Sequence, residues 1–100
     1  MDINVEELKT KIDAGEDFVF IDVREQYEYD EFNLKAQLIP LGNITNAIED
    51  LEEHKAKEVV VHCRSGARSA MAQQLMREAG FQNVRNLTGG VLAWIDKYGS

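Results

Sequence analysis

Four short apolar runs, separated by helix-like stretches, restrict the fold of this chain more than any other feature. The runs are nearly continuous in apolar residues, and the third is made of β-branched side chains, which is typical of strands buried on both faces of a parallel sheet. Residues 1–3 add a candidate edge strand, so about five strands are expected. The four runs are residues 18–21, 38–41, 59–61 and 84–87.

The clearest helix is predicted over residues 68–79, and Gly80 follows it as a terminator. Its apolar side chains recur at spacings of three and four residues. They are Ala72, Leu75, Met76 and Ala79. Strand and helix alternate along the whole chain, which predicts a three-layer α/β fold in a single domain over residues 1–100. The parallel sheet of about five strands then carries helices on both faces.

Composition and charge exclude several classes of function. The formal net charge is −7 and no basic stripe is present, which argues against nucleic-acid binding. One cysteine and two separated histidines provide neither a disulfide nor a metal-ligand cluster, and no cofactor is expected. No signal-peptide pattern opens the chain and no apolar run is long enough for a membrane span, so no membrane association and a cytoplasmic location are expected.

The candidate site is the loop that begins at Cys63, between the third apolar run and the clearest helix. Sites in parallel α/β folds form beyond the carboxyl ends of the strands, and Cys63 lies at that place. Thiolate is the reactive form of cysteine, and the N-terminus of a helix stabilises it. Arg64 and Arg68 add positive charge, and Gly66 permits a backbone conformation in which successive amides converge on an anion.

A simpler interpretation is that Cys63 is a buried small hydrophobic residue beside surface arginines. The two arginines, a serine and a glycine among the next five residues favour an anion-binding loop instead. In that interpretation Ser65, Gly66 and Ala67 supply backbone amides, while Arg64 and Arg68 attract and orient an anionic substrate.

With these residues in place, the sequence resembles the rhodanese-like sulfurtransferases. Four motifs carry the resemblance, in order and across nearly the whole chain. They are Asp22-Val23-Arg24-Glu25 after the first apolar run, Leu38-Ile39-Pro40-Leu41 as the second strand, Val60-Val61-His62-Cys63-Arg64-Ser65-Gly66-Ala67-Arg68-Ser69 as the active-site loop, and Leu87-Thr88-Gly89-Gly90 with Trp94 near the end.

The resemblance implies a sulfurtransferase that carries a sulfur atom on Cys63 as a persulfide. The donor would be a small anion or persulfide such as thiosulfate or glutathione persulfide, or else a protein persulfide, and the acceptor would be a thiophilic group, which could also be a protein. An alternative of another class is a relay or regulatory module that accepts persulfide from a partner protein with little turnover of small donors. The physiological donor and acceptor and the oligomeric state stay open.

Loop length separates this chemistry from that of cysteine-dependent phosphatases and arsenate reductases. The related phosphatases place their arginine after five intervening residues, whereas four residues separate Cys63 from Arg68. The shorter loop resembles the sulfur-transferring branch. No strong general acid is evident nearby, and a thiolate leaving group needs little acid catalysis.

Two supporting residues and one loop complete the expectations. Asp22 is expected either to orient Arg24 or a loop amide, or to cap the helix that follows, and Arg24 is expected to be structural. His62 should point to the opposite face of the strand from Cys63 and be packed rather than act as a base. Relatives usually carry Gly-His and then Gly-Ala before the second strand, but residues 32–37 lack both, so the course of residues 30–37 is not predicted.

Overall fold

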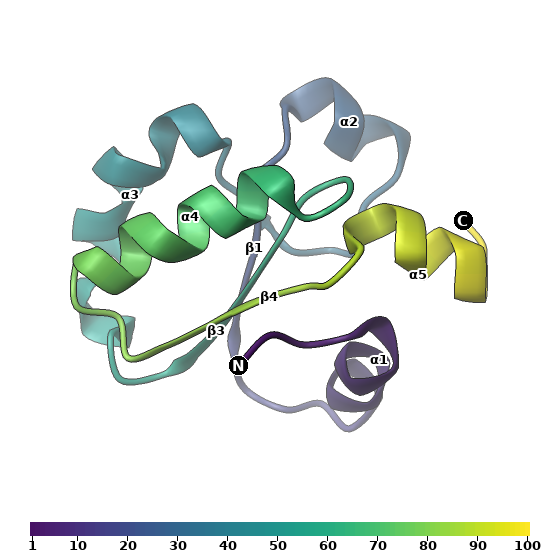
Figure 1. Ribbon diagram of the computed structural model, residues 1–100, viewed down its shortest axis with the longest axis horizontal. Helices are drawn as coiled ribbons and strands as arrows, with labels where there is room; N and C mark the ends of the chain where they lie inside the picture. Colours follow the sequence, from purple (N-terminus) through teal and green to yellow (C-terminus); the bar gives the residue numbers. More distant parts are fainter.

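A parallel four-stranded sheet forms the centre of the computed structural model, which describes residues 1–100 (Figure 1). The strands lie in the order β2-β1-β3-β4. Their bounds are Val19–Asp22 for β1, Gln37–Leu38 for β2, Glu58–His62 for β3 and Asn83–Asn86 for β4.

The prediction of a fifth strand at residues 1–3 is wrong in detail. Ile3 makes a single parallel bridge to Leu87, and no second residue of this segment pairs with the sheet. The reason is local: Asn4 caps a helix that starts at Val5, so the chain leaves the sheet after one bridge. The α/β class and the parallel arrangement are confirmed.

Helices cover both faces of the sheet, as predicted. In Figure 1, α3 and α4 lie on one side of the strands, and α1 and α5 lie on the other. The helices are α1 Val5–Asp13, α2 Gln26–Glu31, α3 Ile44–Asp50, α4 Ala67–Glu78 and α5 Gly90–Tyr98, with short 3-10 turns η1 Leu41–Asn43 and η2 Glu52–His54. None of the helices has the length and apolar character needed to cross a bilayer.

Alternation along β3 divides the core into two clusters. Val59, Val61 and Cys63 pack on the side of α3 and α4, among twelve buried residues that include Met76. Val60 faces the other side, in a cluster of five buried residues that belong mainly to the N-terminal segment and the end of β4. Strand side chains alternate between faces, so Cys63 and its neighbour His62 point in opposite directions.

The predicted buried face of α4 is confirmed at Ala72 and Met76 but not at Leu75. Leu75 is 36% exposed, while Ser69 and Gln73 are buried together with Met76. Both polar side chains are satisfied by hydrogen bonds: the Nε2 of Gln73 donates to the carbonyl of Val84 at 2.8 Å. Tertiary partners therefore rotate the buried stripe away from the position that hydrophobic spacing alone indicates.

Strand register brings the site residues to one edge of the sheet. Asp22 at the end of β1 lies opposite His62 at the end of β3, and Asn86 at the end of β4 lies opposite Val61. The loop that starts at Cys63 therefore emerges between the ends of two neighbouring strands.

The course of residues 32–37, which could not be predicted, is set by local hydrogen bonds. Lys35 has φ 65°, in the left-handed region that non-glycine residues rarely adopt. Its backbone N–H donates to Oδ1 of Asn33 at 2.9 Å, and the hydroxyl of Tyr29 donates to the carbonyl of Ala36 at 2.9 Å. These contacts hold a tight turn where a glycine is absent.

Candidate active site

Cys63 is 1% exposed, and its sulfur lies at the centre of the loop between β3 and α4. Three groups donate to Sγ: the backbone N–H of Gly66 at 3.1 Å, the backbone N–H of Ser69 at 3.4 Å and the Ser69 hydroxyl at 3.3 Å. Gly66 makes this closure possible, because it adopts φ 113° immediately before α4. The loop is thus a concave set of donors that converges on one sulfur atom.

These donors make the thiol more acidic than an ordinary cysteine. Burial is the largest single influence and raises the pKa of Cys63, since it disfavours the charged form. The Ser69 hydroxyl and the amides of Ser69, Gly66 and Ser65 act in the other direction and hold the pKa below its ordinary value. The thiolate is therefore favoured by hydrogen bonds from the loop; of the amides predicted for this role, those of Ser65 and Gly66 are among them.

Ser69 is a functional residue that sequence reasoning did not single out. It belongs to the first turn of α4 and is fully buried. Its single hydroxyl proton has three acceptors within reach and is donated to one of them at a time: Sγ of Cys63 at 3.3 Å, Oδ1 of Asn86 at 2.6 Å and the carbonyl of Gly66 at 3.2 Å. Its spacing was the available signal: Ser69 lies three residues before Ala72 and seven before Met76, on the same face of the helix as these two buried residues.

Asn86 is the second residue that the sequence did not indicate. It ends β4, and its Nδ2 donates to the carbonyl of Gly66 at 3.1 Å. That contact fixes the orientation of the amide, so Oδ1 faces the Ser69 hydroxyl. Its position at the carboxyl end of a strand, directly before Leu87-Thr88-Gly89-Gly90, was the signal that could have found it.

The start of α5 supports the loop from the other side. The N–H groups of Val91 and Leu92 donate to the carbonyls of Cys63 and Arg64, both at 3.0 Å. Gly90 has φ 56°, and a Cβ placed there would lie 2.5 Å from the Cys63 carbonyl oxygen. Gly90 therefore allows close approach of α5 to the loop that starts at Cys63, whereas a Cβ at Gly89 would meet Ala93 of α5 itself.

The two arginines of the loop have different environments. Arg68 forms a two-pronged ion pair with Glu28 of α2, with Nη1–Oε1 and Nη2–Oε2 distances of 2.6 and 2.8 Å. The Arg68 guanidinium lowers the pKa of Glu28 to about 2, and the carboxylate raises the pKa of Arg68. Arg64 is exposed and makes no ion pair. The structure thus presents one free cation at the loop where the sequence suggested two.

Asp22 orients Arg24, which was one of its two expected roles. Both oxygens of Asp22 accept from the Arg24 side chain, at 2.8–3.1 Å, and Oδ1 also accepts from the Arg24 backbone N–H. The helix-cap alternative is wrong, because Glu25 caps α2 through a capping box with Glu28. Arg24 in turn donates to the carbonyl of Phe32 at 2.7 Å, so this buried pair positions the turn at residues 32–37.

His62 is buried on the opposite face from Cys63, as predicted, with its ring 5.3 Å from that of Phe20. Its Nε2 lies 3.6 Å from Oδ2 of Asp22 and has no hydrogen-bond partner. Burial lowers the pKa of His62 to about 4, so the ring is neutral at physiological pH. Nowhere in the structure do three or more histidine, cysteine or acidic side chains gather closely enough to hold a metal ion.

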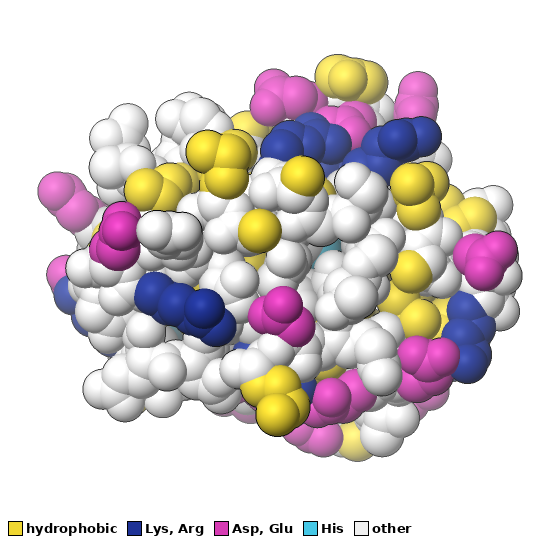
Figure 2. Space-filling model, in the orientation of Figure 1, with side chains coloured by type: hydrophobic (Ala, Val, Ile, Leu, Met, Phe, Trp, Pro, Cys, Tyr) yellow, Lys and Arg dark blue, Asp and Glu magenta, His cyan; other side chains and the backbone are white.

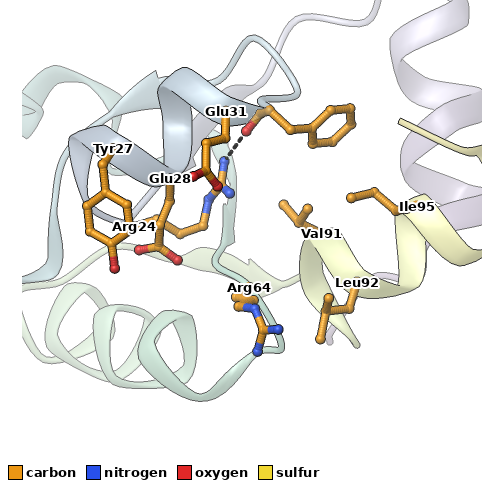
Figure 3. Close-up of a pocket in the computed structure, with 9 residues that line it drawn as sticks. Arg24, Tyr27, Glu28, Glu31, Arg64, Val91, Leu92 and Ile95 are labelled. Carbon is orange, nitrogen blue, oxygen red and sulfur yellow. Dashed lines mark hydrogen bonds between the residues drawn. The ribbon is translucent and has the colours of Figure 1, made fainter.

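A cavity of about 300 Å³ opens beside the loop, between α2 and α5 (Figure 3). In the close-up, Val91, Leu92 and Ile95 project from α5 on one side, and Tyr27 and Glu28 lie across from them on the side of α2. Figure 2 shows basic side chains lying side by side over this part of the molecule, bordered by acidic ones. The cavity is lined by Arg24, Tyr27, Glu28, Glu31, Phe32, Arg64, Val91, Leu92 and Ile95.

Comparison with curated proteins places these features in a family. The rhodanese-like domain model matches residues 4–97. A Bacillus subtilis protein named "Putative sulfurtransferase YtwF" is 42% identical over 94 residues, which are 93% of this chain and 88% of that protein. A second B. subtilis protein, "Putative sulfur carrier protein YrkF", is 35% identical over 97 residues, 96% of this chain; the chain spans 51% of its length.

Solved structures of related proteins have the same fold as this chain. A rhodanese-related protein from Thermoplasma volcanium superposes with a TM-score of 0.83 at 28% identity, covering 99% of this chain and 94% of that one. The human single-domain sulfurtransferase TSTD1, at 24% identity and a TM-score of 0.80, covers 96% of both chains and shares the fold. Since the family model spans nearly the whole sequence, this chain belongs to the rhodanese-like domain family.

Proposed function

We propose that this chain transfers a sulfane sulfur, with Cys63 as the nucleophile and carrier. The observation that carries the proposal is the sulfur of the only cysteine, held by three donors at 3.1–3.4 Å at the carboxyl end of a parallel sheet. A pKa below the ordinary value supplies the thiolate that this chemistry requires. The names of YtwF and YrkF, which concern sulfur transfer and sulfur carriage, support the same class of reaction.

The reaction needs two displacements at sulfur. In the first, the Cys63 thiolate attacks the outer sulfur of a donor R–S–SH; the S–S bond of the donor breaks and R–S⁻ leaves with the electron pair. The outer sulfur, with its proton, is then bound to Sγ as a persulfide. Thiosulfate would react in the same way with sulfite as the leaving group. In the second displacement, an acceptor thiolate or cyanide attacks the outer sulfur, and Cys63 leaves as a thiolate.

The loop residues divide these tasks. Amides of Ser65, Gly66 and Ala67 would solvate the charge on the outer sulfur; that of Gly66 already donates to Sγ at 3.1 Å. Arg64, exposed and unpaired, would attract an anionic donor. Arg68, predicted to share that role, is bound to Glu28 and would instead hold the loop against α2. A phosphatase is disfavoured for the same reason, since the arginine that would bind phosphate is already paired.

A second candidate is a sulfur relay that accepts persulfide from a partner and turns over slowly on small donors. The match to YrkF, named as a sulfur carrier, favours it. Steady-state formation of thiocyanate from thiosulfate and cyanide separates the two. A free-standing enzyme gives sustained, Cys63-dependent turnover, and Arg64→Ala should lower kcat/KM for thiosulfate by roughly five-fold, the effect of about one surface charge at short range. A single stoichiometric loading without turnover indicates the relay, and activity that survives in Cys63→Ser contradicts both.

A further inference from the structure

We infer that Glu28 sets the charge preference of the site, so that Cys63 accepts sulfur from alkyl persulfides in preference to dianionic donors such as thiosulfate. The inference rests on the proposed function and goes further by naming a donor class and the residue that selects it. Glu28 acts here as a specificity-determining residue, because it controls whether Arg68 is available to a negatively charged donor.

The Glu28–Arg68 ion pair is held by hydrogen bonds to both oxygens of the carboxylate. Both oxygens of Glu28 are engaged by the guanidinium at 2.6 and 2.8 Å, and the Glu28 side chain is only 12% exposed. Oε1 of Glu28 also accepts from the backbone N–H of Glu25 at 3.0 Å, which anchors the carboxylate to the start of α2. Two-pronged arginine–carboxylate contacts have a fixed geometry, so the donor groups of Arg68 are occupied by Glu28, whose charge offsets that of the guanidinium; the Cys63 thiolate still contributes to the raised pKa of Arg68.

The charges around the cavity cancel. Three arginines, Arg24, Arg64 and Arg68, stand against three carboxylates, Asp22, Glu28 and Glu31. Arg24 is bound to Asp22 and Arg68 to Glu28, which leaves Arg64 as the only cation without an ion pair. The whole chain carries a formal charge of −7, so a dianion that approaches the site is compensated by Arg64 alone.

The remainder of the cavity wall is apolar. Val91, Leu92 and Ile95 of α5 face the cavity from one side in Figure 3, and Phe32 also lines it. A surface of this kind suits the carbon skeleton of an organic persulfide better than the oxygens of a small oxyanion. One unpaired cation beside an apolar wall matches a donor with at most one negative charge near its transferable sulfur.

The test uses reagents that differ in charge and not in mechanism. Iodoacetate is an anion and iodoacetamide is neutral, and both alkylate the thiolate of the single cysteine. The ratio of their rates therefore reports the electrostatic preference of the site independently of the Cys63 pKa. Glu28→Gln frees Arg68, while Glu31→Gln removes the same charge from the same cavity without touching the loop, and so serves as the matched control.

Glu28→Gln should raise the iodoacetate to iodoacetamide ratio by roughly five-fold more than Glu31→Gln does, since a unit charge at short range in water has about this effect. Arg68→Gln, which leaves Glu28 unpaired, should lower the ratio below that of the wild type. Equal ratios in the Glu28 and Glu31 variants, or an unchanged ratio in Arg68→Gln, overturn the inference.

The same variants are then loaded with thiosulfate, with a small-thiol persulfide and with a persulfidated peptide, and single-turnover rates are measured by mass. Wild-type protein should load faster from the persulfides, and the faster of the two persulfide arms identifies the source. Glu28→Gln should selectively accelerate loading by thiosulfate. If the alkylation ratio shifts as expected but no donor loads Cys63, the charge preference stands and the proposed sulfur transfer fails. If loading occurs but thiosulfate is preferred in the wild type, the inference fails and the proposed function stands.

Discussion

The hydroxyl of Ser69 lies 3.3 Å from the sulfur of Cys63, and it is the one side-chain group among the donors that favour the thiolate. Removing it in Ser69→Ala should raise the pKa of Cys63, because burial would then be opposed by backbone amides alone. Hydrogen bonds to charged groups contribute about 1.5–3 kcal/mol, so alkylation at neutral pH should slow by roughly ten-fold or more. Ser65→Ala is the control, since Ser65 contributes through its amide and its side chain is exposed. Equal alkylation rates in the two variants would show that the Ser69 hydroxyl does not lower the pKa of Cys63.

The lowered pKa of Cys63 also predicts how stability depends on pH. A thiol whose folded pKa is below its unfolded value stabilises the fold fully above the unfolded pKa of about 8.5. That contribution is lost as pH falls from there through the folded value. The free energy of unfolding of the wild type, relative to Cys63→Ser, should therefore increase between neutral and mildly alkaline pH. A decrease in this free-energy difference over the same pH range would mean that folding raises the pKa of Cys63.

Glu28→Gln should destabilise the protein in a pH-dependent way. The pKa of Glu28 is lowered from 4.5 to about 2 by Arg68, so its ion-pair contribution is present above about pH 4.5 and is lost as pH falls toward 2. Because Arg68 is 35% exposed, the contribution should be about 1–2 kcal/mol near neutrality. Urea unfolding of both proteins from pH 2 to 7 checks this. A stability difference that does not shrink at low pH would contradict the assignment.

Gly90→Ala should disrupt the loop and the activity together. The added Cβ would lie 2.5–2.6 Å from the carbonyl oxygens of Cys63 and Arg64, so either α5 or the loop must move, at a cost of at least about 2 kcal/mol. Gly42→Ala is the matched control, because nothing lies within 4 Å of its Cβ and its φ is not in the left-handed region. The midpoint of thermal unfolding and the rate of sulfur loading should both fall in Gly90→Ala and stay unchanged in Gly42→Ala. A loss of stability in both variants would show that the close approach of Gly90 to the loop is not the cause.

Lys35→Gly should stabilise the protein by about 0.5–1 kcal/mol, because Lys35 occupies a left-handed conformation that costs a non-glycine residue about 1 kcal/mol or more. The gain is partly offset by the greater chain entropy of glycine in the unfolded state. Ala14→Gly, at an exposed right-handed helical position, should have the opposite sign. Urea midpoints measure both, and destabilisation by Lys35→Gly would show that the turn is not strained.

The sequence allowed prediction of what depends on local pattern. Apolar runs and glycine positions indicated a parallel α/β sheet with helices on both faces, and the order of elements located the Cys63 loop at the carboxyl ends of the strands. Hydrophobic spacing was misleading on α4, where Leu75 is partly exposed and the polar Ser69 is buried. Burial there depends on tertiary hydrogen-bond partners, which periodicity does not report.

Contacts between distant residues could not be predicted. Glu28 and Arg68 are 40 residues apart, and nothing in the local sequence of α2 indicates that one of its carboxylates binds the active-site loop. Asn86 likewise reaches Ser69 across 17 residues, through the pairing of β3 with β4. Such pairs follow from strand order and register, which apolar pattern alone leaves undetermined.

The central claim is that Cys63 carries sulfur, and intact-mass measurement after incubation with an alkyl persulfide tests it most directly. The protein should gain the mass of one sulfur atom, return to its original mass with cyanide or dithiothreitol, and show no gain in Cys63→Ser. Loading that is absent in the wild type under conditions where alkylation shows an accessible, reactive thiolate would contradict the claim, and so would the same gain in Cys63→Ser.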